Sequence, residues 1–421
     1  MRHIVELCKS SGKKFKTVPS LNEMINKDVS VDSIREVSYL DLLGREEVQL
    51  DVNSIEKFIK SKRIMITGAG GSIGSELVRQ CLQYKPGSLI ILDNSEANLF
   101  TIEQECLRME KLTLVKAVLA NIKDKKLMTN VFAEYRPQVV FHAAAYKHVP
   151  MQELSPWSAV ATNVFGTLHL TQLSNQFNVE KFVLVSTDKA VHPVNIMGAT
   201  KRLAEKIVQS SIDGRENKPI NLAVRFGNVL NSSGSVVPIF RDQINNGGPV
   251  TVTHPEMSRY FMSIPEAGQL ILQASAMAQQ PGEVFILDMG KPVKIKDMAY
   301  DLIRLSGFEP EIEIPVIYTG LRPGEKMYEE LVTREEKVNK TVHPKILIMK
   351  NSAIKQPWDD LKVDIEKLIN IPLTFNSNSI KQKLQQMMPE YEPLDYSPPV
   401  PNEAMNQELF EIEKSTIKGQ A

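Results

Sequence analysis

From residue 63 onward, short apolar runs alternate with longer segments in which apolar residues recur every three or four positions. The first apolar run, at 63–67, predicts a β-strand, and the segment 75–82 after it predicts a helix. The same pattern predicts strands at 88–92, 112–119, 138–141, 182–186 and 221–225, and helices at 96–109, 125–135, 156–177 and 198–210. This alternation predicts an α/β fold, a Rossmann-type doubly wound parallel sheet with helices on both faces.

Turn residues become frequent after residue 228, and the alternation of strands and helices weakens there. We interpret residues 61–230 as the Rossmann domain and residues 231–350 as a smaller C-terminal substrate-binding domain over the carboxyl edge of the sheet. Residues 1–60 are interpreted as a linker. Residues 351–421 contain several prolines, and we interpret them as an extension that is either loosely packed or an oligomer contact.

The 50 Lys and Arg residues balance the 50 Asp and Glu residues, which leaves no broad basic surface for nucleic acid or an anionic membrane. The three cysteines form neither a disulfide framework nor a paired metal-ligand spacing, and the seven histidines do not cluster, so no metal site is predicted. No apolar run is long enough to span a bilayer, and Glu6 falls where a signal peptide needs apolar residues. We therefore expect a soluble cytoplasmic chain that contacts neither nucleic acid nor membrane.

A glycine-rich turn joins the first predicted strand to the first helix. Gly68 permits the tight turn, Gly71 lets the backbone approach a pyrophosphate, and Gly74 lets the helix pack close to the strand. Asp93 ends the second strand about twenty residues later, as the dinucleotide-binding pattern requires. Its carboxylate can accept hydrogen bonds from a ribose diol and would repel a 2′-phosphate. The sequence therefore predicts NAD rather than NADP.

Two neighbouring motifs, STDKAV at 186–191 and NIMGATKR at 195–202, resemble the extended short-chain dehydrogenase/reductase superfamily. More narrowly, they resemble the polysaccharide-biosynthesis branch of UDP-N-acetylglucosamine 4,6-dehydratases. Most of the superfamily carries Tyr-x-x-x-Lys, whereas this chain has Met197 in the tyrosine place and keeps Lys201. That methionine is typical of long, membrane-anchored members of the branch. Further motifs that fit the family lie at 142–150, 163–167, 225–230, 234–238, 258–262 and 322–326.

The segments 16–21 and 41–46 also look like the linker that precedes the catalytic domain in long members. The resemblance therefore implies the catalytic part of such an enzyme. A longer natural form would lie in the inner membrane with this domain facing the cytoplasm. We also expect a homo-oligomer.

The resemblance implies an internal redox elimination on UDP-N-acetylglucosamine with retention at C5, in the synthesis of bacterial glycans or glycoprotein sugars. NAD would oxidise C4, water would leave across C5 and C6, and the hydride would return to C6. Asp188 would protonate the departing C6 hydroxyl, and Lys189 would remove the C5 proton. Lys189 must then be partly neutral, which burial and the nearby charge of Lys201 would favour. Thr187 would hydrogen-bond the C4 hydroxyl, and Met197 leaves the base for that hydroxyl unassigned.

Lys201 is expected to bind the nicotinamide ribose, and Asn163 to brace the active site. Relatives usually have aspartate near the adenine, where this chain has Asn121. The predicted cofactor residues are Gly68, Gly70, Gly71, Ser72, Ile73, Gly74, Asp93, Asn121, Ile122, Ala143, Ala144 and Lys201. The predicted substrate residues are Lys147, Arg225, Asn228, Ser235, Arg259, Arg322 and Glu325, with the arginines suited to the diphosphate by their planar charged fork.

Three other functions are compatible with the motifs. A sugar-nucleotide 4-epimerase also oxidises C4, but it usually keeps the tyrosine and has no use for the Asp188–Lys189 pair as acid and base. A dehydratase that inverts C5 usually keeps the tyrosine as well. An inactive NAD-binding protein would explain Met197, but it would leave Asp188, Lys189 and Lys201 without a purpose.

Overall fold

The structure is a computed structural model, and the residues it describes are 39–43, 48–109, 111, 114–210, 219–333, 336–349, 357–371 and 377–394. The proposed linker motif at 16–21 and positions 44–46 of the second one lie outside these residues, as do residues 395–421 of the extension.

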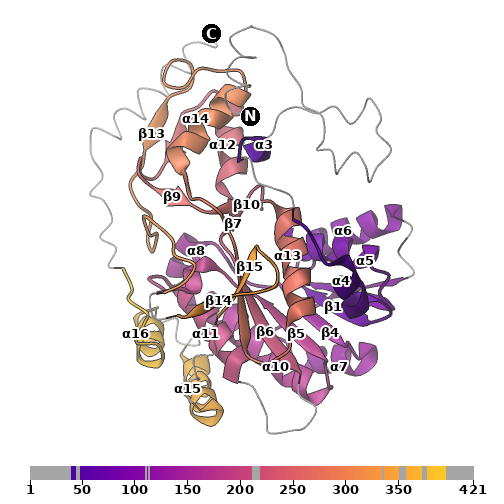
Figure 1. Ribbon diagram of the computed structural model, residues 1–421. Helices are drawn as coiled ribbons and strands as arrows, with labels where there is room; N and C mark the ends of the chain where they lie inside the picture. The colour runs from indigo at the N-terminus through magenta and orange to yellow at the C-terminus, as the bar shows by residue number, and fades with distance from the viewer. Residues whose placement is uncertain are drawn as a thin grey trace.

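A nine-stranded sheet with the order β14-β15-β11-β6-β5-β4-β1-β2-β3 forms the centre of the protein (Figure 1). Seven neighbouring strands are parallel, and β15 and β14 extend the sheet antiparallel. The chain reverses its direction of travel across the sheet between β1 and β4, which creates a crevice at the carboxyl ends of these two strands. The strands are β1 Arg63–Thr67, β2 Ser88–Asp93, β3 Val115–Leu119, β4 Val139–His142, β5 Lys181–Val185, β6 Ile220–Arg225, β11 Glu283–Leu287, β14 Val338–Lys340 and β15 Ile346–Met349. The predicted Rossmann-type fold is confirmed.

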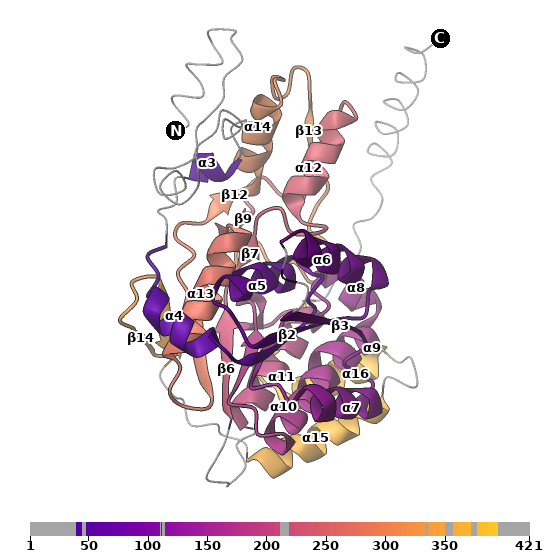
Figure 2. The same cartoon turned by 90° about the vertical axis from the view of Figure 1, so that its right-hand side faces the viewer.

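Helices cover both faces of the sheet, and this explains the nearly continuous apolar strands. In β1, Ile64 and Ile66 pack into the core on one face, and Met65 packs into the core on the other. Figure 2 shows α5 and α6 on one side of β2 and β3, with α7 on the other. The first face carries α4 Val52–Ile59, α5 Ser72–Gln83, α6 Glu96–Arg108 and α13 Ile264–Met277, and the second carries α7 Lys125–Tyr135, α10 Thr167–Gln176 and α11 Ile196–Ser210.

A smaller lobe with its own apolar core lies beyond the carboxyl ends of the parallel strands (Figure 1). It contains α3 Tyr39–Leu43, α12 Val236–Asn245, α14 Ile295–Leu305 and the paired strands β8 Val250–Val252 with β13 Val316–Tyr318, β9 Ser258–Arg259 with β12 Val293–Lys294, and β7 Asn228–Val229 with β10 Phe261–Met262. The division into domains differs from the sequence interpretation, because α4, α13, β11, β14 and β15 belong to the large sheet and its cover.

The helix predicted at 156–177 is divided by a π-helical segment. It consists of α9 Pro156–Ala159, the π-helical segment η3 Val160–Gly166, and α10, and a short helix α8 Val149–Leu154 precedes it. A π-helical turn contains an extra residue and is frequent at functional sites. The π-helical segment contains Asn163, whose side chain contacts two other elements of the site described below.

The C-terminal extension is packed rather than loose in the part that the structure describes. The helices α15 Trp358–Asn370 and α16 Ser377–Met387 pack against α9 and α11. Their buried side chains Leu361, Ile365, Ile380 and Leu384 share one apolar cluster with Leu203. Within the described residues, none of the helices has the length and apolar character needed to cross a membrane.

Candidate active site

The glycine-rich turn brings β1, α5 and the loop after β4 within van der Waals distance. Gly68 has φ +69°, and a β-carbon there would lie 2.6 Å from the Ala144 nitrogen. A β-carbon on Gly74 would lie 1.9 Å from the Gly68 carbonyl oxygen, so only glycine fits. Gly71 precedes α5 and makes no side-chain cap, which leaves the first amide groups of the helix available to an anion.

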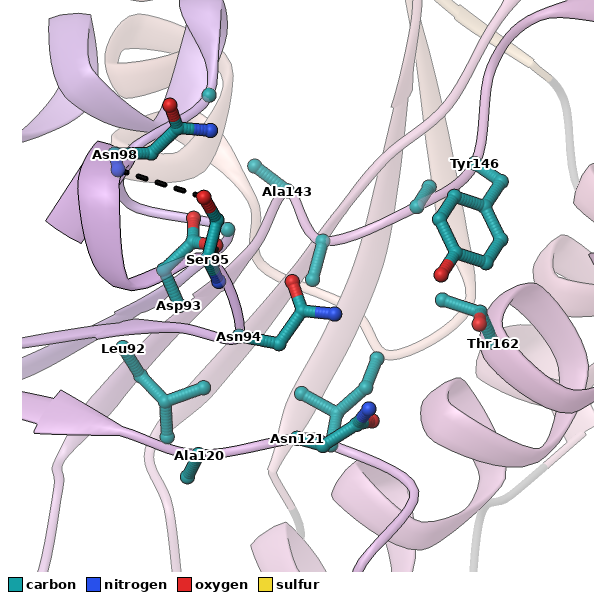
Figure 3. A pocket seen from close by; sticks show the side chains of 15 residues that line it. Leu92, Asp93, Asn94, Ser95, Asn98, Ala120, Asn121, Ala143, Tyr146 and Thr162 are labelled. Atoms are coloured by element: carbon teal, nitrogen blue, oxygen red, sulfur yellow. Dashed lines mark hydrogen bonds between the residues drawn. The ribbon is translucent and has the colours of Figure 1, made fainter.

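A pocket lies at the carboxyl ends of β1, β2, β3 and β4, at the crevice in the sheet (Figure 3). Seven predicted cofactor residues line it: Gly68, Gly71, Asp93, Asn121, Ile122, Ala143 and Ala144. Gly70, Ser72, Ile73, Gly74 and Lys201 are not part of its lining. The sequence interpretation missed the other residues of the wall, Leu92, Asn94, Ser95, Asn98, Ala120, Ala145, Tyr146 and Thr162.

Asp93 is fixed in the wall of this pocket by backbone donors. Gly70 N–H donates to Oδ2 at 2.9 Å and Ser95 N–H donates to Oδ1 at 2.9 Å. Figure 3 shows Asn94 and Asn121 between Asp93 on one side and Tyr146 and Thr162 on the other. The lining contains one carboxylate and neither lysine nor arginine. A ribose diol fits such a wall, whereas a 2′-phosphate would meet a negative charge without a compensating cation.

Hydrogen bonds tie the carboxyl ends of β1 and β4 together behind the pocket. Thr167 Oγ1 donates to the Asn163 carbonyl, so it must accept from Nε2–H of His142 at 3.0 Å. Nδ1 of His142 then accepts from Thr67 Oγ1 at 2.8 Å. Burial and, secondarily, the charge of Lys201 lower the pKa of His142 to about 3, so the ring is neutral. The sequence interpretation gave this histidine no role.

Asn163 joins three elements around the site, as the sequence predicts for a bracing residue. Its Oδ1 accepts from Tyr146 N–H at 2.9 Å, and its Nδ2 donates to the Tyr146 carbonyl and to Thr200 Oγ1. The loop after β4, the π-helical segment and α11 are thereby held in one arrangement.

Asp188 and Lys189 form a close pair in a short 3-10 turn directly after β5. Lys189 Nζ donates to Asp188 Oδ1 at 3.0 Å and to Asn228 Oδ1 at 3.2 Å, and Thr187 Oγ1 donates to Asp188 Oδ1 at 2.9 Å. The Asp188 side chain has no exposed surface, and the Lys189 side chain is 15% exposed. Asp188 Oδ2 is buried and has no hydrogen-bond partner among the described residues.

The pKa of Lys189 differs from the sequence expectation. Burial lowers the pKa of this lysine, but the carboxylates of Asp188 and Glu329 outweigh burial and raise it above its usual value. The expectation of a partly neutral Lys189 is therefore wrong for the protein without substrate. The sequence could not reveal this, because Glu329 is 140 positions away from Lys189 and reaches it only through the fold.

Lys201 and Met197 lie one turn apart on α11, and both are buried. Lys201 Nζ donates to the Val185 carbonyl at 2.7 Å, at the end of β5. Burial lowers the pKa of Lys201 to about 8, although Glu205 acts in the opposite direction. Met197 cannot exchange a proton, so its side chain contributes apolar packing here.

Two arginines expected to bind the nucleotide diphosphate are engaged inside the protein. Arg225 is completely buried, with its guanidinium paired to Glu205 at 2.8 Å and to Glu336 at 2.9 Å. Arg259 donates to three backbone carbonyls, those of Ser258, Lys326 and Met327. Both guanidinium groups are thus engaged by protein partners in the structure. The substrate role of Arg225 and Arg259 stays a prediction.

The remaining predicted substrate residues lie on several loops at this edge. Asn228 contacts Lys189 directly, whereas Lys147 and Arg322 are exposed. Glu325 accepts from Arg322 N–H in a loop that Asn195 ties down by donating to the Gly324 carbonyl at 2.9 Å. Ser235 is the N-cap residue before α12, and its Oγ has no hydrogen-bond partner among the described residues.

The family model described as "Polysaccharide biosynthesis protein" matches residues 64–351, more than half of the chain. The chain belongs to the polysaccharide biosynthesis protein family. The resemblance inferred from the motifs at 186–202 is thereby confirmed at the level of the family. The match includes the glycine-rich turn, the Asp188–Lys189 pair and the Gly324 loop.

Relatives in this family include the capsular polysaccharide biosynthesis protein CapD of Staphylococcus aureus. It is 46% identical over 348 residues, which are 82% of this chain and 57% of that protein. The probable polysaccharide biosynthesis protein EpsC of Bacillus subtilis is 45% identical over 366 residues, which are 87% of this chain and 60% of that protein. The chain thus spans about three fifths of the length of these two relatives.

Solved structures give the same fold. Pen from Bacillus thuringiensis is 32% identical with a TM-score of 0.65, and the match covers 75% of this chain and 99% of Pen. DesIV from Streptomyces venezuelae, described as a dTDP-glucose 4,6-dehydratase with NAD and DAU bound, has a TM-score of 0.53 at 20% identity, covering 61% of this chain and 84% of DesIV. The second likeness concerns the fold alone.

Proposed function

We propose that the chain catalyses NAD-dependent 4,6-dehydration of UDP-N-acetylglucosamine with retention at C5. The product is UDP-2-acetamido-2,6-dideoxy-α-D-xylo-hexos-4-ulose. One observation carries the proposal: the Asp188 carboxyl and the Lys189 amine are paired at the carboxyl edge of the sheet. The pair follows β5, which lies next to β4, and residues just after β4 line the dinucleotide-type pocket. Elimination of water across C5 and C6 needs an acid and a base close together.

NAD fits the pocket described above. Gly68, Gly71 and the start of α5 would hold the pyrophosphate, and Asp93 would accept hydrogen bonds from the adenine ribose. Asn121 and Ile122 line the part of the pocket where the adenine would lie. The chemistry that NAD supplies when bound is reversible acceptance of a hydride from the hexose.

The proton transfers belong to the 187–189 turn. In the proposed reaction Asp188 gives a proton to the departing C6 hydroxyl and Lys189 removes the proton from C5. This requires the proton that Lys189 holds in the protein without substrate to lie on Asp188 when water is eliminated. Because the Asp188 side chain has no exposed surface, contact with a sugar hydroxyl requires that a neighbouring group moves aside. Thr187 Oγ1 already donates to Asp188, which holds the carboxyl in one orientation.

A 4-epimerase is the second candidate, because proteins described as UDP-glucose 4-epimerases in several Rickettsia species are 34–35% identical over about two thirds of this chain. An epimerase transfers no proton at C5 or C6, so it gives Asp188 and Lys189 no chemical task. Met197 in the usual tyrosine place also disfavours it. An inactive NAD-binding protein would leave the buried pair unexplained.

Incubation of the purified chain with UDP-N-acetylglucosamine tests the proposal by proton NMR. We expect a C6 methyl doublet to appear without net reduction of NAD. Asp188→Asn protein, prepared in parallel, controls for contaminating enzymes and should give no doublet. A 4-epimer would establish the second candidate, and unchanged sugar would refute both reactions.

Gly74→Ala should weaken NAD binding, because the added methyl group would collide with the Gly68 carbonyl oxygen and force α5 away from the turn. We expect the dissociation constant for NAD, measured by calorimetry, to rise at least about tenfold. Ser75→Ala on the same helix is the matched control. It removes only a hydroxyl that donates to the Ser72 carbonyl, and it should leave NAD affinity nearly unchanged.

A further inference from the structure

A second carboxylate, besides that of Asp188, lies close to the Lys189 amine. The Glu329 side chain is 3% exposed, and its Oε1 lies 3.6 Å from Lys189 Nζ. The same oxygen lies 3.9 Å from Arg259 Nε. At 3.6 Å the contact with Lys189 is an ion pair rather than a hydrogen bond, so it acts through charge. Lys189 therefore lies near two buried carboxyl groups, and only that of Asp188 has a role in the proposed reaction.

The position of Glu329 is fixed by contacts of the segment around it. Arg259 donates to the carbonyls of Lys326 and Met327, and Ser258 N–H donates to the Met327 carbonyl at 3.3 Å. Lys326 Nζ in turn donates to the Val191 carbonyl at 3.2 Å, directly after the turn that carries Lys189. These bonds hold the segment against the 188–191 turn.

The charged groups that face this cluster are Asp188, Lys189, Arg259, Lys326 and Glu329. Burial raises the pKa of Glu329, the charge of Lys189 lowers it, and Asp188 raises it further, so the net direction is upward. The same geometry favours the ammonium form of Lys189 whenever Glu329 is ionised. The ammonium form cannot remove a proton from carbon, so the charge on Glu329 opposes the base form of Lys189.

We propose that Glu329 is a positioning residue whose negative charge sets how readily Lys189 gives up its proton. Its carboxylate keeps the lysine in place and charged before substrate binds. Without that charge, as in Glu329→Gln protein, Lys189 loses its proton at lower pH. The link to dehydration rests on the proposed function, whereas the effect on Lys189 ionisation does not.

The ionisation of Lys189 can be measured without substrate. Only the neutral amine reacts with acetic anhydride, so the rate of Lys189 acetylation, mapped by peptide mass spectrometry, reports the amine fraction. At pH 9 we expect Glu329→Gln to raise this rate at least about tenfold, since a neighbouring charge shifts a pKa by about one to three units and one unit is a tenfold change in amine. Glu329→Asp keeps the negative charge but places it farther from Lys189, so the acetylation rate of Lys189 should rise less in this variant than in Glu329→Gln.

Glu330→Gln is the matched control, because Glu330 is the next residue, is exposed, and contacts His192 rather than Lys189. It should leave the acetylation rate of Lys189 unchanged. Equal rates in wild type and folded Glu329→Gln would overturn the proposal. Equal increases in Glu329→Gln and Glu329→Asp would also overturn it, because they would indicate packing rather than charge. If Glu329→Gln does not fold, a higher rate in Glu329→Asp supports the proposal and an unchanged rate overturns it.

The pH dependence of kcat for dehydration provides the catalytic readout. In Glu329→Gln the part of the kcat–pH profile in which kcat rises with the base form of Lys189 should move to lower pH. The shift should match the increase in the acetylation rate. A faster acetylation with an unmoved kcat–pH profile would refute the catalytic role of Glu329. Absence of keto product from the wild type would refute the proposed function instead, and the acetylation result would still decide the ionisation of Lys189.

Discussion

Asp188→Asn is expected to lower kcat for dehydration at least about a hundredfold, because an amide cannot give a proton to the departing C6 hydroxyl. The amide has nearly the shape of the carboxyl, and it can still accept from Thr187 Oγ1 and Lys189 Nζ. The pocket that is proposed for NAD does not include Asp188, so NAD affinity should stay within about twofold of wild type. Steady-state kinetics with UDP-N-acetylglucosamine and calorimetry with NAD measure the two quantities.

Met197→Ala provides the comparison within the same site. It removes buried apolar packing from the first turn of α11 but no group that exchanges a proton. Its loss of kcat should therefore be smaller than that of Asp188→Asn. Near-normal turnover by the asparagine variant would remove Asp188 from the mechanism, and an equally large loss in Met197→Ala would mean that the methionine has a role beyond packing.

The strands, the helices beside them and the glycine-rich turn could be predicted because their causes are local. In β1 the residues Ile64, Met65 and Ile66 are buried on alternate faces, and the apolar run alone shows that both faces are covered. Gly74 is required by a contact six positions away, with the Gly68 carbonyl. Asp93 stands at the end of β2, and its two backbone partners are close to it for simple reasons. Ser95 is two positions away in the sequence, and Gly70 follows β1, which pairs with β2.

Long-range pairing explains what could not be predicted. An arginine in a motif that fits the family can face a phosphate or a buried carboxylate, and the sequence around Arg225 does not distinguish the two. Its partners Glu205 and Glu336 are 20 and 111 positions away. The same reason hides Glu329, which reaches Lys189 only because Arg259 and Lys326 hold its segment in place. Charged groups therefore need the fold before a role can be assigned to them.

The ion pairs of Arg225 also connect the active-site turn to the rest of the fold. Glu205 on α11 pairs with Arg225 on β6, and Ser186, two positions before Asp188, donates to Glu205 Oε1 at 2.6 Å. Arg202 contacts both Glu205 and Glu390, and Glu390 follows the C-terminal helices. The network thus joins the end of β5, α11 and the C-terminal extension.

Arg225→Met is accordingly expected to lower the free energy of unfolding by about 3–5 kcal/mol, because it leaves the buried carboxylate of Glu205 and the partly buried carboxylate of Glu336 without their partner on β6. Urea denaturation at neutral pH measures the change. Lys60→Met breaks an exposed ion pair with Glu56 on α4 and should cause no measurable change. A folded, fully stable Arg225→Met protein that has lost affinity for UDP would instead support the phosphate role suggested by the sequence.

The pH dependence gives this prediction a second test. Burial would raise the pKa of Glu205, but Arg225 reverses the effect and lowers it to about 2. A carboxyl with a lowered pKa contributes stability that is fully present above its ordinary pKa of 4.5 and is lost as the pH falls toward about 2. The difference in unfolding free energy between wild type and Arg225→Met should therefore shrink across this window, because protonation of Glu205 removes the charge that Arg225 neutralises. A difference that stays constant from pH 7 to pH 2 would mean that Arg225 stabilises the protein through packing alone.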